Sequence, residues 1–100
     1  SETFEQMKNS ALLINAARGP LVDEQALLQA LTTQQIAGAA LDVYEFEPAV
    51  TAGLKEQSNV ILTPHIGNAS VEARNDMAEI VAKNTIALFE KQPIHHIVNP

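Results

Sequence analysis

The sequence contains no cysteine, which excludes disulfide bonds and thiolate metal sites. Long apolar stretches are also missing, because runs such as Ala11–Ile14 and Gly38–Leu41 are too short to cross a bilayer. Basic residues are scarce, with 6 Lys and Arg against 12 Asp and Glu, for a formal net charge of −6. This negative charge argues against nucleic acid or an anionic membrane surface as a partner, although a single arginine could still recruit a small anion.

No secretory signal is predicted, because the chain opens at Ser1 without a basic segment followed by an apolar one, and we expect a cytoplasmic protein. Of the 100 residues, 46% are apolar and 18% are charged, which is typical of an ordinary soluble globular fold. A chain of this length holds one domain at most.

Short apolar segments predict three strands. The wholly apolar run Ala11–Ile14 is too short for a helix and is typical of a strand covered on both faces. Ile36–Leu41 predicts a strand of mostly small residues that stops at Asp42. Asn59–Thr63 predicts a third strand, which Pro64 ends.

Helical patterns surround these strands. Residues 3–8 indicate the end of a helix, with Asn9 in the left-handed closing position. Asp23 is expected to cap a helix that runs to about Thr33 and presents an apolar face.

A long helix over residues 71–91 is expected after Ser70, its cap, and before Pro93. Apolar side chains cover so much of its circumference that burial on more than one side is expected. The tail 95–100 is expected to be extended. Because helices and strands alternate along the chain, the pattern predicts an α/β fold with a parallel sheet and right-handed crossovers.

Ionisable residues follow all three predicted strands. The first strand leads to Arg18, the second to Asp42 with Glu45 and Glu47 close behind, and the third to His65. The carboxyl ends of parallel strands lie at one edge of the sheet, where open α/β sheets bind their ligands. We therefore expect these side chains to meet at that edge.

The three residue types permit a specific chemistry. An arginine can hold a carboxylate through two hydrogen bonds, and a histidine can donate a proton to a developing alkoxide. A carboxylate on the other ring nitrogen fixes the tautomer of the histidine and stabilises its protonated form. This set suits the reduction of a 2-oxo acid, with a cofactor as the source of hydride because no side chain can supply it.

Three motifs resemble a known family: Asn15–Asp23 (NAARGPLVD), Gly38–Pro48 (GAALDVYEFEP) and Leu62–Gly67 (LTPHIG). They resemble the closing motifs of the D-isomer-specific 2-hydroxyacid dehydrogenases, and within that family most of all the glyoxylate/hydroxypyruvate and 2-ketogluconate reductases. The resemblance implies an α/β fold with a partial Rossmann-like parallel sheet of about three strands and flanking helices. It also implies an oxidoreductase that reduces a small 2-oxo acid, glyoxylate or hydroxypyruvate by preference, with NADP or NAD as cofactor.

The resemblance also implies roles for individual residues. Arg18 would bind the substrate carboxylate and polarise the oxo group, His65 would be the acid/base, and Glu47 would be its partner. The residues implied for the nicotinamide side of the cofactor site are Ala16, Ala17, Arg18 and Asp42, closed by His65 and Gly67, with Asp42 meeting the carboxamide. No metal is implied.

Family members are longer than this chain, and their G-x-G-x-x-G fingerprint lies upstream of the matching segment. The four glycines here, Gly19, Gly38, Gly53 and Gly67, do not stand in that spacing. We expect residues 1–100 to be the C-terminal part of the NAD(P)-binding domain, inactive alone, with the tail 92–100 returning toward the absent substrate domain. The resemblance implies a homodimer for the intact enzyme, whereas the unpaired edge of the first strand predicts self-association of the isolated segment.

Other interpretations stay open. Arg18 and His65 could be ordinary loop residues, Glu45 is expected to be solvated or structural, and Arg74 is either a solvated helix position or faces the active-site side. The adjacent His95 and His96 have no carboxylate or cysteine nearby in the sequence, so no metal site is predicted there. The rival function is that of an NAD(H)-sensing corepressor of the same family, and a third interpretation gives the segment no function of its own.

Overall fold

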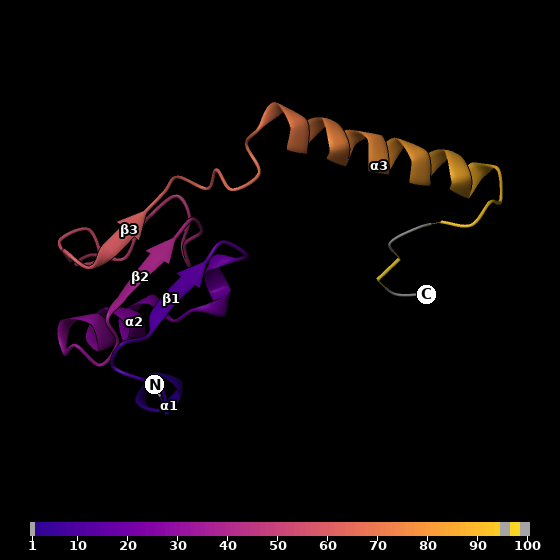
Figure 1. Ribbon diagram of the computed structural model, residues 1–100. Coiled ribbons are helices and arrows are strands. Elements are labelled where there is room, and N and C mark those ends of the chain that lie inside the picture. The colour runs from indigo at the N-terminus through magenta and orange to yellow at the C-terminus, as the bar shows by residue number, and fades with distance from the viewer. Residues whose placement is uncertain (1, 95–96, 99–100) are drawn as a thin grey trace. The chain divides into compact units, whose positions relative to one another are not determined.

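The computed structural model describes residues 2–94 and 97–98. The chain forms two compact units, Ser1–Gly67 and Asn68–Pro100. The second unit contains one long helix, α3 (Val71–Phe89) (Figure 1). His95 and His96, together with the last two residues of the predicted tail, lie outside the described residues.

The first unit carries a three-stranded parallel sheet. Its elements follow the order α1 (Glu2–Glu5), β1 (Leu12–Asn15), the 3-10 helix η1 (Gly19–Leu21), α2 (Glu24–Thr32), β2 (Gly38–Leu41) and β3 (Val60–Leu62). The strands lie in the order β1-β2-β3, with Ile14 paired to Ala40 and Ala40 paired to Ile61. This arrangement confirms the predicted α/β fold and places the carboxyl ends of all three strands at one edge (Figure 1).

Helix α2 supplies one side of the core. Asp23 caps it as predicted, since its side chain accepts a hydrogen bond from the Ala26 N–H at 2.9 Å. The apolar face of α2, including Leu27 and Leu31, shares a buried cluster with Leu41 of the sheet. Burial of these side chains holds β2 in place, and with it the loop that follows β2.

The prediction that the first strand is covered on both faces is wrong for this structure. Leu12 is 68% exposed, Ile14 is 74% exposed and Ile61, on β3, is 66% exposed. A parallel sheet requires a layer of helices on each face. In the described part of the first unit, only α2 is long enough to provide such a layer, so one face stays open.

The end of α1 also differs from the prediction. Helix α1 ends at Glu5, and Asn9 is not left-handed. Hydrogen-bonded turns close this segment instead, with the Met7 N–H donating to the Phe4 carbonyl and the Ala11 N–H to the Lys8 carbonyl. A left-handed residue is therefore not needed there.

Helix α3 begins as predicted, because the Ser70 hydroxyl accepts a hydrogen bond from the Ala73 N–H at 3.1 Å. It ends at Phe89, followed by Lys91 at a φ of 55°. None of its residues is buried, so the predicted burial on more than one side is not observed. The second unit has no other described helix or strand that could cover it. In the described ranges 2–94 and 97–98, no helix has the length and hydropathy of a membrane span.

Candidate active site

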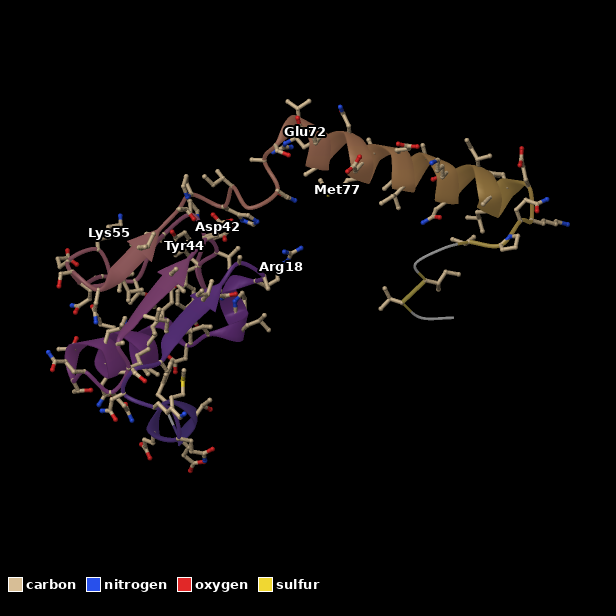
Figure 2. All side chains as sticks on the ribbon, in the orientation of Figure 1. Arg18, Asp42, Tyr44, Lys55, Glu72 and Met77 are labelled. Carbon is tan, nitrogen blue, oxygen red and sulfur yellow. The ribbon has the colours of Figure 1, made fainter. Side chains whose placement is uncertain are left out.

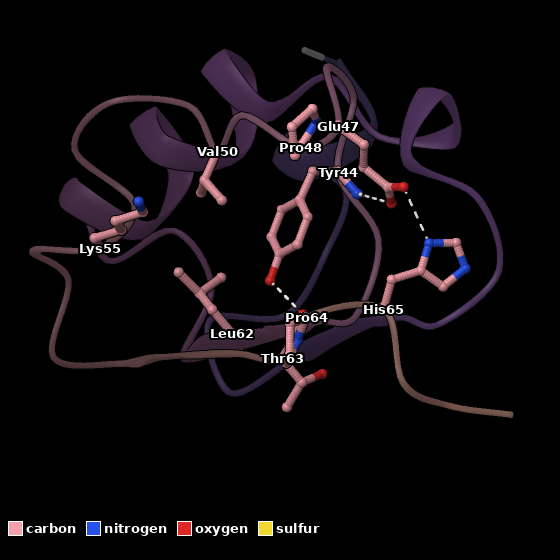
Figure 3. A pocket seen from close by; sticks show the side chains of 9 residues that line it. All are labelled: Tyr44, Glu47, Pro48, Val50, Lys55, Leu62, Thr63, Pro64 and His65. Atoms are coloured by element: carbon pink, nitrogen blue, oxygen red, sulfur yellow. Dashed lines mark hydrogen bonds and ion pairs between the residues drawn. The ribbon is translucent and has the colours of Figure 1, made fainter. Parts of the chain in front are cut away.

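Glu47 and His65 form a hydrogen-bonded pair at the carboxyl edge of the sheet. His65 Nδ1 lies 3.0 Å from Glu47 Oε2 (Figure 3). The other carboxylate oxygen, Oε1, accepts a hydrogen bond from the Tyr44 backbone N–H, also at 3.0 Å. The bond to His65 and then the bond from Tyr44 hold the pKa of Glu47 below its ordinary value, and the positive charge of Arg18 contributes further.

This pairing defines which ring nitrogen of His65 is available for chemistry. An ionised carboxylate can only accept hydrogen bonds, so Glu47 favours the ring form that carries a proton on Nδ1. Nε2 is then the atom that gains and loses the second proton. A histidine oriented in this way can act as an acid or a base at Nε2.

His65 itself has an uncommon backbone conformation, with a φ of 54°. A side chain other than glycine is rarely stable in this left-handed region unless the surrounding contacts enforce it. Asp42 supplies such contacts on both sides of His65. Its Oδ1 accepts hydrogen bonds from the Thr63 hydroxyl at 2.5 Å and the Ile66 N–H at 2.9 Å, and its Oδ2 accepts one from the Gly67 N–H at 2.7 Å.

These bonds give Asp42 a function that the sequence did not indicate. The hydroxyl of Thr63, followed by the two backbone N–H groups, holds the pKa of Asp42 below its ordinary value. Asp42 therefore fixes the loop that carries His65. The predicted contact between Asp42 and a cofactor carboxamide stays a prediction.

Tyr44 connects the two loops and was not singled out from the sequence. Its hydroxyl donates a hydrogen bond to the Thr63 carbonyl at 2.7 Å, while its backbone N–H binds Glu47. Burial raises the pKa of Tyr44 above its ordinary value, which keeps the hydroxyl protonated and able to donate. Its position two residues after Asp42, inside the second motif, was the available signal.

Arg18 shares a hollow with the Glu47–His65 pair. The hollow has a volume of about 520 Å³, and its lining consists of Arg18, Gly19, Pro20, Tyr44, Glu45, Phe46, Glu47 and His65. Asn15 shapes the loop before it, because its side chain donates to the Arg18 carbonyl at 2.9 Å and accepts from the Ala17 N–H at 3.2 Å. The structure thus brings to one hollow the arginine, carboxylate and histidine expected to meet; their chemical roles stay predictions.

Some of the residues predicted to contact the cofactor gather around a smaller hollow of about 160 Å³. Its lining lies at the carboxyl ends of the strands and comprises Ile14, Asn15, Ala16, Ala40, Leu41, Asp42, Ile61 and Thr63. Gly67 and Ala17 do not line this hollow, but each donates a backbone hydrogen bond to a residue that does. Gly67 donates to Asp42, and Ala17 donates to Asn15. Arg18 and His65, which were also predicted for the cofactor site, line the hollow of about 520 Å³ instead. Contact of these residues with a cofactor stays a prediction.

A third hollow, of about 680 Å³, also includes Glu47 and His65 in its lining (Figure 3). It is lined mainly by apolar and aromatic side chains, with Lys55 as the added charge: Tyr44, Glu47, Pro48, Val50, Lys55, Leu62, Thr63, Pro64 and His65. Figure 2 shows Arg18, Asp42 and Tyr44 following the strands from which the site is built. Arg74 is an exposed residue of α3.

Comparison with known proteins identifies the family. Residues 1–67 match the NAD-binding domain of the D-isomer specific 2-hydroxyacid dehydrogenases. A protein of Staphylococcus haemolyticus that is named as a 2-hydroxyacid dehydrogenase is 57% identical over 99 residues, which cover 99% of this chain and 31% of that protein.

Solved structures of the same family have this fold. An NADPH-dependent glyoxylate/hydroxypyruvate reductase from Sinorhizobium meliloti, in complex with NADP and malonate, is 44% identical with a TM-score of 0.80, over 88% of this chain and 28% of that one. A D-lactate dehydrogenase with NAD⁺ from Lactobacillus jensenii is 38% identical with a TM-score of 0.76, over 99% of this chain and 34% of that one.

The chain spans about a third of the length of these relatives. The family match covers all three strands and all the residues of the candidate site. The fold is the Rossmann-like sheet of the NAD-binding domain of this family. This chain belongs to the D-isomer-specific 2-hydroxyacid dehydrogenases.

Proposed function

We propose that this chain carries the acid/base pair and the substrate-binding arginine of a reductase that converts a small 2-oxo acid to the 2-hydroxy acid with NADPH or NADH. The observation that supports it most strongly is the shared hollow, in which Arg18 lies beside a histidine paired with a carboxylate at 3.0 Å. The similarity to the S. meliloti enzyme favours glyoxylate and hydroxypyruvate as substrates.

In this mechanism Arg18 binds the substrate carboxylate through its planar guanidinium and orients the oxo group toward His65. The nicotinamide cofactor, when bound, supplies hydride to the carbonyl carbon. His65 donates its Nε2 proton to the carbonyl oxygen, which thereby becomes the hydroxyl oxygen of the 2-hydroxy acid. Glu47 stabilises the protonated ring before transfer and keeps it oriented. In the reverse direction, neutral His65 accepts the hydroxyl proton.

The cofactor residues follow the same proposal. Ala16, Ala17 and Asp42 would line the nicotinamide side, with His65 and Gly67 closing it. The four glycines of the chain do not form the phosphate-binding fingerprint, so the cofactor phosphates would be bound by upstream sequence. In this proposal residues 1–100 form the C-terminal part of the cofactor domain, the tail 92–100 returns toward the substrate domain, and the intact enzyme is a homodimer.

The test uses the complete protein that carries this chain. Oxidation of NADPH and NADH is followed with glyoxylate, hydroxypyruvate and pyruvate, for the wild type, His65→Gln and the exposed-site control Glu56→Gln. We expect turnover of glyoxylate or hydroxypyruvate that falls by about 10² to 10⁴ in His65→Gln and is unchanged in Glu56→Gln. Binding of NAD(H) without turnover of any 2-oxo acid would contradict the proposal and favour the corepressor function.

A further inference from the structure

Glu24 is a buried carboxylate that the proposed chemistry does not use. It is the first residue of α2 and only 1% exposed. A carboxylate is rarely buried this completely unless hydrogen bonds replace the water that it loses. Within the described part of the chain, the hydrogen bonds that the Glu24 carboxylate accepts come from the loop that carries Glu47.

Both oxygens of Glu24 bind backbone N–H groups of this loop. Oε1 accepts a hydrogen bond from the Glu45 N–H at 2.8 Å, and Oε2 accepts one from the Thr51 N–H at 3.0 Å. The loop returns one bond, because Glu45 Oε2 accepts from the Glu24 N–H at 3.2 Å. The two anchored N–H groups lie on either side of Glu47 in the sequence, so Glu24 fastens both ends of the segment 45–51 to α2.

The hydrogen bonds of Glu24 are connected to Glu47 through two neighbouring residues, Tyr44 and Glu45. Tyr44, whose N–H holds Glu47 Oε1, directly precedes the anchored residue Glu45. Within the segment, the Ala49 N–H donates to the Phe46 carbonyl at 2.9 Å and closes a turn around Glu47. The segment 45–51 is thus held to α2 near both ends and to His65 through Glu47 in between.

We propose that Glu24 is a positioning residue that sets the Glu47–His65 geometry. The geometric part of this inference stands on the contacts above, and its consequence for catalysis rests on the proposed function. A buried carboxylate that served the fold alone would lower thermal stability when replaced, but it would leave the pair unchanged in every variant that folds.

Two substitutions remove the anchor in different ways. Glu24→Gln keeps the size of the side chain but has only one oxygen, and its NH₂ group cannot accept from the second N–H. Glu24→Asp keeps the negative charge at the start of α2 but is one methylene too short to hold both N–H groups. If the Gln variant does not fold, the Asp variant tests whether Glu24 positions Glu47. Glu56→Gln, at an exposed position of the same unit, is the matched control.

The complete protein is examined with two independent measurements. The first is the proton NMR signal of the His65 Nδ1–H hydrogen-bonded to Glu47, which does not depend on activity. We expect it to shift upfield or disappear in folded Glu24→Gln and Glu24→Asp and to stay in Glu56→Gln. The second is turnover, where we expect kcat to fall on the order of tenfold with little change in KM, because a small misplacement of a catalytic group affects the transition state most.

The outcomes separate this inference from the proposed function. An unchanged Nδ1–H signal and an unchanged kcat in a folded Glu24 variant would overturn the positioning role. Loss of the signal in a protein that reduces no 2-oxo acid would support the positioning role and contradict the proposed function instead.

Discussion

Gly19 lies directly against the backbone of Tyr44: a Cβ atom added to Gly19 would be 1.7 Å from the Tyr44 carbonyl oxygen. Gly19 follows Arg18, and Tyr44 begins the loop that carries Glu47. The contact therefore sets how closely the loop of the arginine approaches the loop of the carboxylate. Only a residue without a side chain permits this approach, because the atoms it meets belong to the backbone.

Gly19→Ala is expected to destabilise the fold. The added methyl group requires backbone movement at Tyr44 or Glu45, and overpacking of this kind costs about 1 to 3 kcal/mol in the free energy of unfolding. Urea unfolding of the variant beside Ala52→Ser, an exposed position, measures the effect. A Gly19→Ala protein as stable as the wild type would show that the two loops are not in contact.

Replacing Arg18 by lysine is expected to lower kcat/KM for 2-oxo acids by about tenfold to 100-fold. The ammonium group keeps the charge but loses the two parallel hydrogen bonds of the guanidinium, and a hydrogen bond to a charged group contributes about 1.5 to 3 kcal/mol. Steady-state kinetics with Lys8→Met, which removes an exposed positive charge elsewhere, provides the control. Equal losses in both variants would show that Arg18 acts only through the overall charge.

Asp42→Asn is expected to destabilise the protein in a pH-dependent way. The pKa of Asp42 is lowered from its ordinary 3.8 in the folded state, so the ionised carboxylate stabilises the fold above that pH, and this contribution is lost as the pH falls through the lowered pKa. The difference in unfolding free energy between wild type and variant is therefore largest near neutral pH and shrinks below pH 3.8. Urea unfolding at several pH values measures it, and a difference that does not change with pH would contradict the hydrogen-bond pattern at Asp42.

The isolated 100-residue chain is expected to self-associate. Strand β1 is an edge strand, and Leu12 and Ile14 expose apolar side chains beside its unpaired backbone. Light scattering at increasing concentration should show oligomers, and Ile14→Lys should reduce them. A stable monomer of the unchanged chain at high concentration would contradict this expectation.

Much of the fold could be predicted because local patterns determined it. The caps at Asp23 and Ser70 and the three apolar segments gave the order of elements, and their alternation gave the parallel sheet. The open face of β1 and the exposed surface of α3 could not be predicted in this way. An apolar pattern shows that a face can be buried, but it does not show whether the same chain covers it.

The candidate site was predictable to a similar degree. Arg18, Glu47 and His65 stand out because each follows a strand and each carries a reactive group. Asp42 was expected to meet a cofactor, whereas its hydrogen bonds to Thr63, Ile66 and Gly67 depend on how two loops meet in space. The hydrogen bonds of Glu24 could not be predicted for the same reason. In the sequence Glu24 is an ordinary acidic residue in the first turn of a helix, and only the fold brings its carboxylate to the N–H groups of Glu45 and Thr51.

A double-mutant cycle on Glu47 and His65 tests the central claim most directly. It compares kcat/KM for glyoxylate in the wild type, Glu47→Gln, His65→Gln and the double variant of the complete protein. If Glu47 acts only through His65, the double variant is as active as His65→Gln alone, because residues that act as a unit show strongly non-additive effects. Losses that multiply in the double variant, or full activity in His65→Gln, would contradict the account of the pair.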